Sequence, residues 1–189
     1  ITVRAAILKE TISEWATWKE NTCFIDSQDS GHEIIVDAGN LDAIVYILLH
    51  EATHVVDAVL NIASHPGGAH DPVAAIPFTA GIWSEINMPT EKATNALLET
   101  TRFRSGKPVA ISLAPAIYEA LRATPFASLY SMASWHEDLA EILTIYHLTQ
   151  ILDQPFTIWI RNRGVDVASY EPFTNKRIRE RQGMLARFY

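Results

Sequence analysis

The chain has 189 residues, 48% of them hydrophobic, which is enough apolar sequence to bury one substantial core, so we expect a single domain over residues 1–189. The formal net charge of −7 argues against a nucleic-acid-binding surface, because such surfaces are normally basic. No apolar run reaches the roughly 18 residues that a membrane-spanning helix needs, so we predict no membrane span.

The single cysteine, Cys23, excludes an intrachain disulfide. The chain therefore suits either a reducing compartment or export from a bacterial cell without disulfides, and the sequence leaves the compartment open. We expect Cys23 to be a small core residue in a strand.

The first third of the chain predicts a helix, two short strands and a second helix. Apolar residues recur at helical spacing over residues 4–20, and β-type runs follow at 22–26 and 33–37, with a turn between them. We expect these two runs to pair as a hairpin. The second helix is expected over residues 41–62. Its expected buried stripe consists of Ile44, Leu48, Val55 and Val59.

The rest of the chain predicts a long loop and mainly helical segments. Residues 64–77 form a loop in which His65 and His70 are either extra ligands or, more simply, polar surface. A strand or lid is expected at 78–86, and helices at 90–104, 114–123 and 134–153. A short strand at 156–161, a turn at 162–164 and a basic helix at 175–187 with a solvated face complete the prediction.

The helix at 41–62 contains His50, Glu51 and His54 in the pattern His-Glu-x-x-His. Residues four apart lie on one face of a helix, so the two histidines can share a metal ion. Glu51 lies about 100° further round, where it can hold a water without being a ligand. This pattern is typical of zinc peptidases. Asp57 is either a support for a ligand histidine or a solvated carboxylate.

A hydrolytic zinc site needs a third protein ligand and one open position. The pattern that continues to a third histidine would need glycine at position 57 and histidine at position 60, where this chain has Asp57 and Leu60. Glu137 and Glu141, one helical turn apart, are the better candidates. Ser134 and Glu137 also have the form of a capping box, so Glu137 can be a capping residue, and His136 is a rival ligand.

Together, these two motifs resemble the gluzincin metallopeptidases, and most closely the catalytic domain of anthrax lethal factor and related bacterial peptidases. That group carries His-Glu-x-x-His-x-Val-Asp, as residues 50–57 do here. It then carries Tyr, six intervening residues and Glu-x-x-Ala-Glu, as residues 130–141 do. The resemblance covers the two motifs and not the whole chain.

The resemblance implies a role for each matched residue. His50, His54 and Glu137 would bind zinc, and Glu51 would be the general base. Glu141 would orient a ligand histidine. Tyr130 would stabilise the oxyanion, although it can also be a core residue, and the rival electrophiles are Tyr146 and His147.

These observations predict an α+β, mostly helical, zincin-like domain with a small sheet before the helix that carries His50 and His54. The later helix, with Glu137, would cross behind it. The expected function is zinc-dependent hydrolysis of peptide or protein substrates. The alternatives are a zinc-binding module without general proteolytic activity, and a hydrolase of a non-peptide amide such as a cell-wall linkage.

Overall fold

The structure is a computed structural model that describes residues 5–26, 29–60, 62–63 and 76–189. The chain is 51% helical and 17% strand, which confirms the α+β, mostly helical class. The predicted loop histidines, His65 and His70, lie outside the described residues.

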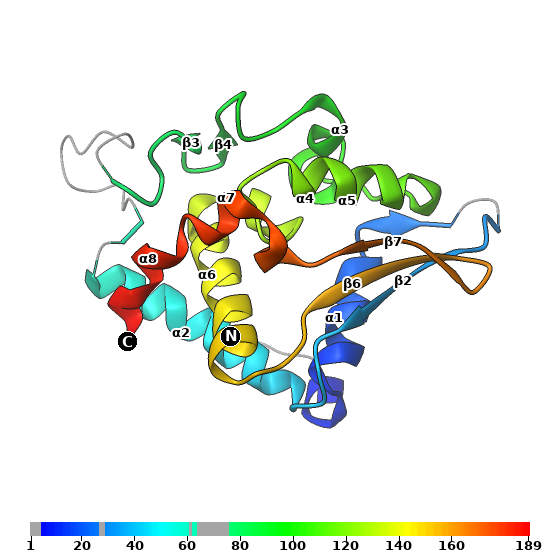
Figure 1. Cartoon of the computed structure of the whole chain (residues 1–189), viewed down its shortest axis with the longest axis horizontal. Coiled ribbons are helices and arrows are strands. Elements are labelled where there is room, and N and C mark those ends of the chain that lie inside the picture. The colour runs from blue at the N-terminus through cyan, green and yellow to red at the C-terminus, as the bar shows by residue number, and fades with distance from the viewer. Residues whose placement is uncertain (1–4, 27–28, 61, 64–75) are drawn as a thin grey trace.

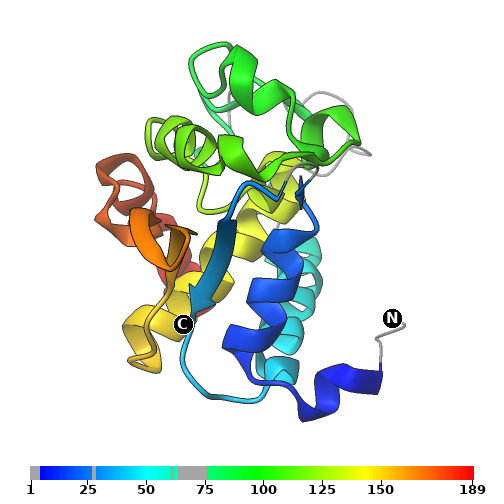
Figure 2. The ribbon, with the colours of Figure 1, turned by 90° about the vertical axis from the view of Figure 1, so that its right-hand side faces the viewer.

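Two long helices, α2 and α6, pack against each other, and α1 packs beside α2 (Figures 1 and 2). Shorter helices α3 to α5 cover one end of this pair; in the view of Figure 1, α7 is drawn in front of the upper end of α6, and α8 follows to its left near the C-terminus. The α-helices are α1 Ile12–Asn21, α2 Ala43–Leu60, α3 Ala96–Glu99, α4 Arg102–Ser105, α5 Ala114–Arg122, α6 Trp135–Tyr146, α7 Lys176–Arg179 and α8 Gln182–Leu185.

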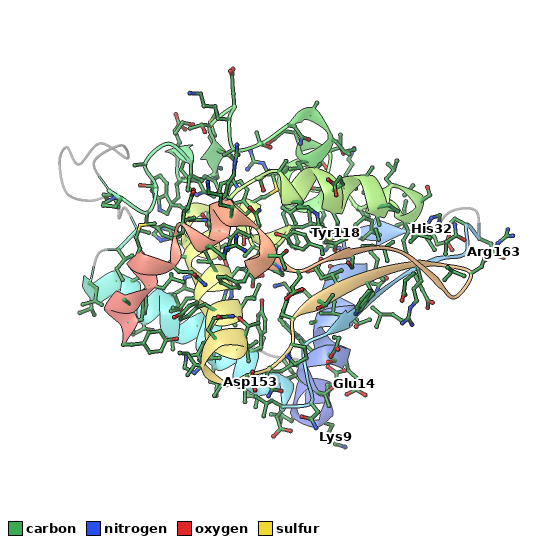
Figure 3. All side chains as sticks on the ribbon, in the orientation of Figure 1. Lys9, Glu14, His32, Tyr118, Asp153 and Arg163 are labelled. Carbon is green, nitrogen blue, oxygen red and sulfur yellow. The ribbon has the colours of Figure 1, made fainter. Side chains whose placement is uncertain are left out.

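The largest sheet is antiparallel and has the strand order β2-β6-β7, formed by β2 His32–Asp37, β6 Thr157–Asn162 and β7 Val165–Tyr170. The turn between β6 and β7 contains Arg163 and Gly164, both with positive φ, as a tight hairpin turn requires. Figure 3 shows Arg163 and His32 together at one end of this sheet and Asp153 towards the other. Of the three strands of this sheet only β2 precedes α2, so the prediction of a small sheet before that helix is only partly right.

The predicted hairpin of residues 22–26 and 33–37 is wrong, although both strands exist. Strand β1, Phe24–Ile25, pairs in parallel with β5, Val109–Ala110, while β2 pairs with β6. The partners lie far along the chain, so no local pattern reveals them. Cys23 is a buried core residue, as predicted, but it lies in the turn directly before β1 and not in a strand.

The first predicted helix divides into two parts at Thr11. A 3-10 helix covers Ala5–Lys9, and Thr11 then caps α1 with a full capping box, in which Glu14 returns a carboxylate oxygen to the Thr11 backbone amide at 2.7 Å. The predicted helix at 90–104 is also divided. It contains the two short helices α3 and α4, and Asn95 caps α3. Before them, strand β3, Trp83–Glu85, pairs with β4, Met88–Pro89.

The predicted buried stripe of α2 is wrong. Leu48, Val55 and Val59 are 61%, 68% and 79% exposed, whereas the buried residues lie on roughly the opposite side of the helix. The physical reason is that α6 meets α2 through polar side chains, so the polar face and not the apolar one is covered. The buried residues of α2 are Ala43, Tyr46, His50, Thr53 and Asp57.

Helix α2 is also long and apolar enough, by length and composition alone, to span a membrane. In the structure 28% of this stretch is buried, and its inner face carries a buried histidine and a buried aspartate that contact α6. The absence of a membrane span stays a prediction.

The basic C-terminal segment is not one solvated helix. It contains α7, α8 and a final 3-10 turn, and between the two helices Arg181 is only 3% exposed. Its guanidinium donates to both carboxylate oxygens of Asp138 on α6, at 3.0 and 2.6 Å. Trp83 donates to the same carboxylate at 3.0 Å. This buried ion pair fixes the C-terminal segment to α6 behind Glu137.

Candidate metal centre

Helices α2 and α6 bring three potential metal ligands to one point. His50 Nε2 lies 3.3 Å from His54 Nε2 and 3.0 Å from Glu137 Oε2. The third side of the triangle, from His54 Nε2 to Glu137 Oε2, is 3.6 Å. His50, His54 and Glu137 therefore form a group that can hold a metal ion.

The start of α6 shows that Glu137 is more than a capping residue. Ser134 Oγ accepts a hydrogen bond from the Glu137 backbone amide at 3.3 Å, so the helix is capped. In the capping box at Thr11 the glutamate side chain returns to the cap, but the carboxylate of Glu137 instead faces His50. The backbone of Glu137 thus serves the cap while its side chain is free for the metal group.

Glu141 lies one turn further along α6 and is fully buried. Its carboxylate accepts hydrogen bonds from Lys19 Nζ at 2.7 and 2.8 Å, from Tyr46 Oη at 2.7 Å and from Ser128 Oγ at 2.6 Å. Its Oε1 atom is also 3.2 Å from His50 Nδ1. Glu141 is therefore held firmly beside the ring nitrogen of His50 that faces away from the metal group.

The charges of the site depend on one another. Burial alone would lower the pKa of His50, but the carboxylates of Glu137 and Glu141 outweigh it and raise this pKa to about 9. Burial alone would raise the pKa of Glu137, but hydrogen bonds to His50 and His54 bring it down to about 2. At neutral pH without a metal, the raised pKa thus favours a protonated His50 ring between the carboxylates of Glu137 and Glu141.

Tyr130 also packs against this group of side chains. Its ring stacks on the His50 ring at 5.8 Å between centroids, and the Lys19 ammonium lies 4.9 Å from its centroid. Burial and the neighbouring carboxylates, Glu137 first among them, raise the pKa of Tyr130 well above its ordinary value. The phenol therefore keeps its proton at neutral pH and can act as a hydrogen-bond donor.

The rival electrophiles lie elsewhere. Tyr146 packs against Phe173 and Tyr189, and His147 Nδ1 is 2.6 Å from Tyr189 Oη. Both rivals thus contact the C-terminal residue. Of the three candidates, Tyr130 is the one whose ring stacks on His50.

Asp57 on α2 and His136 on α6 form a second polar contact between the two helices, separate from the metal group. Asp57 is 1% exposed, so the interpretation as a solvated carboxylate is wrong. Its Oδ1 accepts from the amides of Ile62 and Ala63, and its Oδ2 is 3.3 Å from His136 Nδ1. The Trp135 indole donates to His136 Nε2 at 3.0 Å. Both ring nitrogens of His136 are thus engaged, which argues against it as a rival ligand.

A cavity of about 410 Å³, called the metal-side cavity below, opens beside the metal group. It contains the predicted base Glu51 together with His50 and Tyr130, so the residues predicted to act on a substrate share one space. Its lining residues are Trp15, Trp18, Lys19, Thr22, Tyr46, Ile47, His50, Glu51, Arg102, Phe103, Tyr130 and Glu141.

Several of these residues were not predicted. Tyr46 had a signal, because it lies four residues before His50 and so on the same helix face. Lys19 had none, because it lies 122 positions from the carboxylate that it contacts. Arg102 and Phe103 come from α4, a helix too short to be recognised by periodicity.

Comparison of the chain with protein-family models, curated proteins and solved structures gave no match. The arguments about function therefore depend on the geometry of the site and on the two sequence motifs.

Proposed function

We propose that the protein is a zinc-dependent metallopeptidase with a zincin-like domain of the gluzincin type. The observation that carries this proposal is the meeting of His50, His54 and Glu137 at one point, beside a cavity that also contains Glu51 and Tyr130. The ligands come from two helices that are far apart in the sequence, as the resemblance to gluzincins implies.

Zinc suits the three ligand atoms. Ligand atoms at about 2.1 Å from a tetrahedral zinc ion lie roughly 3.4 Å from one another. The three separations here are 3.0, 3.3 and 3.6 Å, so an ion fits between them with small adjustments. Two imidazoles and one carboxylate are also a ligand set that catalytic zinc sites use, with the fourth position left for water or substrate.

The buried nitrogen of His50 supports the same conclusion. His50 Nδ1 has no partner in good hydrogen-bond geometry among the described residues, although Glu141 Oε1 is only 3.2 Å away. Glu141 Oε1 is thus close enough to accept a hydrogen bond from Nδ1 when Nε2 binds a metal. Metal-binding histidines commonly donate their other N–H group to a carboxylate in this way.

The side chains of the cavity divide the chemistry of hydrolysis between them. A bound zinc ion would polarise the substrate carbonyl and lower the pKa of its water to about 7. Glu51 is the carboxylate that would take a proton from the attacking water and deliver it to the leaving amine. Tyr130, which stays protonated, donates a hydrogen bond to the carbonyl oxygen as that oxygen gains negative charge. Glu141 keeps His50 in place throughout.

The test replaces Glu51 with Gln, which keeps the size of the side chain and removes the base. We expect kcat/KM on a fluorogenic peptide library to fall by roughly 10²–10⁴-fold, with the zinc content unchanged. Glu91→Gln, at an exposed carboxylate outside the lining of the cavity, should keep full activity.

Full activity in Glu51→Gln would contradict the mechanism. If the zinc-loaded wild type cleaves no peptide in the library, the same preparation is tested on peptidoglycan fragments. Cleavage of these alone would replace peptidase with amidase, and no cleavage of either would favour a zinc-binding module.

A further inference from the structure

Two cations line the metal-side cavity, and they differ in what they can offer a ligand. The ammonium of Lys19 has three N–H groups, and it contacts both oxygens of Glu141 at 2.7 and 2.8 Å and Tyr46 Oη at 3.3 Å. Its side chain is only 13% exposed. Lys19 is thus fully engaged in holding Glu141 and has no donor left for a ligand.

Arg102 is in the opposite situation. It is exposed, and Nη1 donates one hydrogen bond of 2.6 Å to the carbonyl oxygen of Thr22, another residue of the cavity lining. Within the part of the chain that the structure describes, no carboxylate lies within ion-pair distance of its guanidinium. The bond to Thr22 fixes one N–H group, and four of the five donors of the guanidinium stay available.

The neighbouring arginine of the same helix shows the contrast. Arg104 donates to both oxygens of Glu99 and to the backbone carbonyls of Asn87 and Met132. Arg104 is thus a structural residue, whereas Arg102 uses one N–H group in the bond to Thr22 and keeps its other four N–H groups available for a ligand.

Much of the wall of the cavity that Arg102 lines is apolar. Trp15, Trp18, Phe103 and Tyr130 contribute aromatic rings, and Ile47 adds an aliphatic side chain. A guanidinium beside such a wall is less hydrated than one on an open surface, so a carboxylate binds it more tightly there. Glu51 is the other charged group of the lining for which the described part of the chain shows no ion pair, and its carboxylate would repel an anion placed next to it. An anionic group therefore fits at the Arg102 side of the cavity and not at the Glu51 side.

We propose that Arg102 binds a carboxylate of the substrate, so that the preferred substrates are peptides with a carboxylate close to the scissile bond and an apolar group next to it. The carboxylate belongs either to the C-terminus of the peptide or to an Asp or Glu side chain. This inference rests on the proposed peptidase function, because it takes the metal group as the place where the scissile bond lies.

The test measures binding and not turnover, so it is independent of catalysis. The probes are three hydroxamates of one design, malonyl hydroxamate joined to phenylalanine amide, to phenylalanine with a free carboxylate, and to phenylalanyl-glutamic acid amide. The first is neutral at its end, the second has a C-terminal carboxylate and the third has a side-chain carboxylate. Calorimetry on the zinc-loaded wild type should show at least one of the charged probes binding about tenfold more tightly than the neutral one.

Two substitutions of Arg102 and one control identify the residue responsible. Arg102→Gln should reduce the preference for the carboxylate to less than about twofold, while affinity for the neutral probe stays the same. Arg102→Lys should keep part of the preference, because it retains the charge but loses the two-pronged geometry. Lys107→Gln removes the same charge from an exposed residue outside the lining, and it should leave the preference intact.

Equal binding of all three probes by the wild type would overturn the inference, as would an unchanged preference in Arg102→Gln or a lost one in Lys107→Gln. Failure of every hydroxamate to bind a protein that contains zinc would overturn both this inference and the proposed peptidase site. Binding of the neutral probe without any preference would overturn only the role of Arg102.

Discussion

Replacement of Lys19 with Met tests the network that holds Glu141 beside His50. Lys19 contacts both oxygens of Glu141, and the side chains of the pair are only 13% and 1% exposed. Removal of one partner from a buried ion pair costs about 3–5 kcal/mol, because the other charge is left uncompensated. Tyr46 and Ser128 still donate to the carboxylate, and the His50 ring, whose pKa is raised to about 9, lies 3.2 Å from it, so we expect the lower end, about 3 kcal/mol.

The assay is urea unfolding of the zinc-free protein, with thermal unfolding as a second readout. For a chain of this length, a loss of about 3 kcal/mol corresponds to a fall in Tm of roughly 6–12 °C. The double variant Lys19→Met, Glu141→Gln should be more stable than Lys19→Met alone, because it no longer contains an unpaired buried carboxylate. Lys107→Met, at an exposed position, should change stability by less than about 0.5 kcal/mol. A cost below about 1 kcal/mol for Lys19→Met, or additive effects in the double variant, would refute this reasoning.

Three further predictions concern the metal group. Glu137→Ala should weaken zinc binding by more than the roughly 10–100-fold expected for loss of a supporting residue, and Glu91→Ala should not, as measured by competition with a chelating dye. Because the pKa of His50 is about 9 without metal, zinc binding at pH 7 should release about one proton. Calorimetry in buffers of different ionisation enthalpy measures this proton release. No release would contradict the assignment of His50 as a metal ligand. The raised pKa of His50 also stabilises the zinc-free fold, fully below about pH 6.5, and this contribution is lost as the pH rises through 9. Urea should therefore unfold the zinc-free protein more easily at pH 9.5 than at pH 7. A flat profile would argue against the raised pKa.

Local patterns were sufficient to predict the helices that carry the site. The four-residue spacing of His50 and His54 fixes both on one face of α2, and Ser134 marks the start of α6. Helix α5 was predicted almost to the residue, because Pro115 in its first turn marks its beginning. The meeting of Glu137 with the histidines required the resemblance to gluzincins, since a capping box explains the same residues.

Other features depend on contacts between distant parts of the chain. The buried side of α2 was predicted on the wrong face, because hydrophobic periodicity assumes that apolar residues are covered. Here Glu141 and Glu137 cover the polar face instead, and Leu48 and Val55 stay exposed. The role of Lys19 and the parallel pairing of β1 with β5 have no local signature, because each joins segments that are distant in sequence.

The most direct test of the metal centre is a crystal structure of the protein grown with zinc, with diffraction data collected on both sides of the zinc absorption edge. We predict one strong anomalous peak at about 2.0–2.2 Å from His50 Nε2, His54 Nε2 and Glu137 Oε2, with an open fourth position towards the metal-side cavity. A peak at other residues, or a zinc ion bound by the histidines without Glu137, would contradict the account.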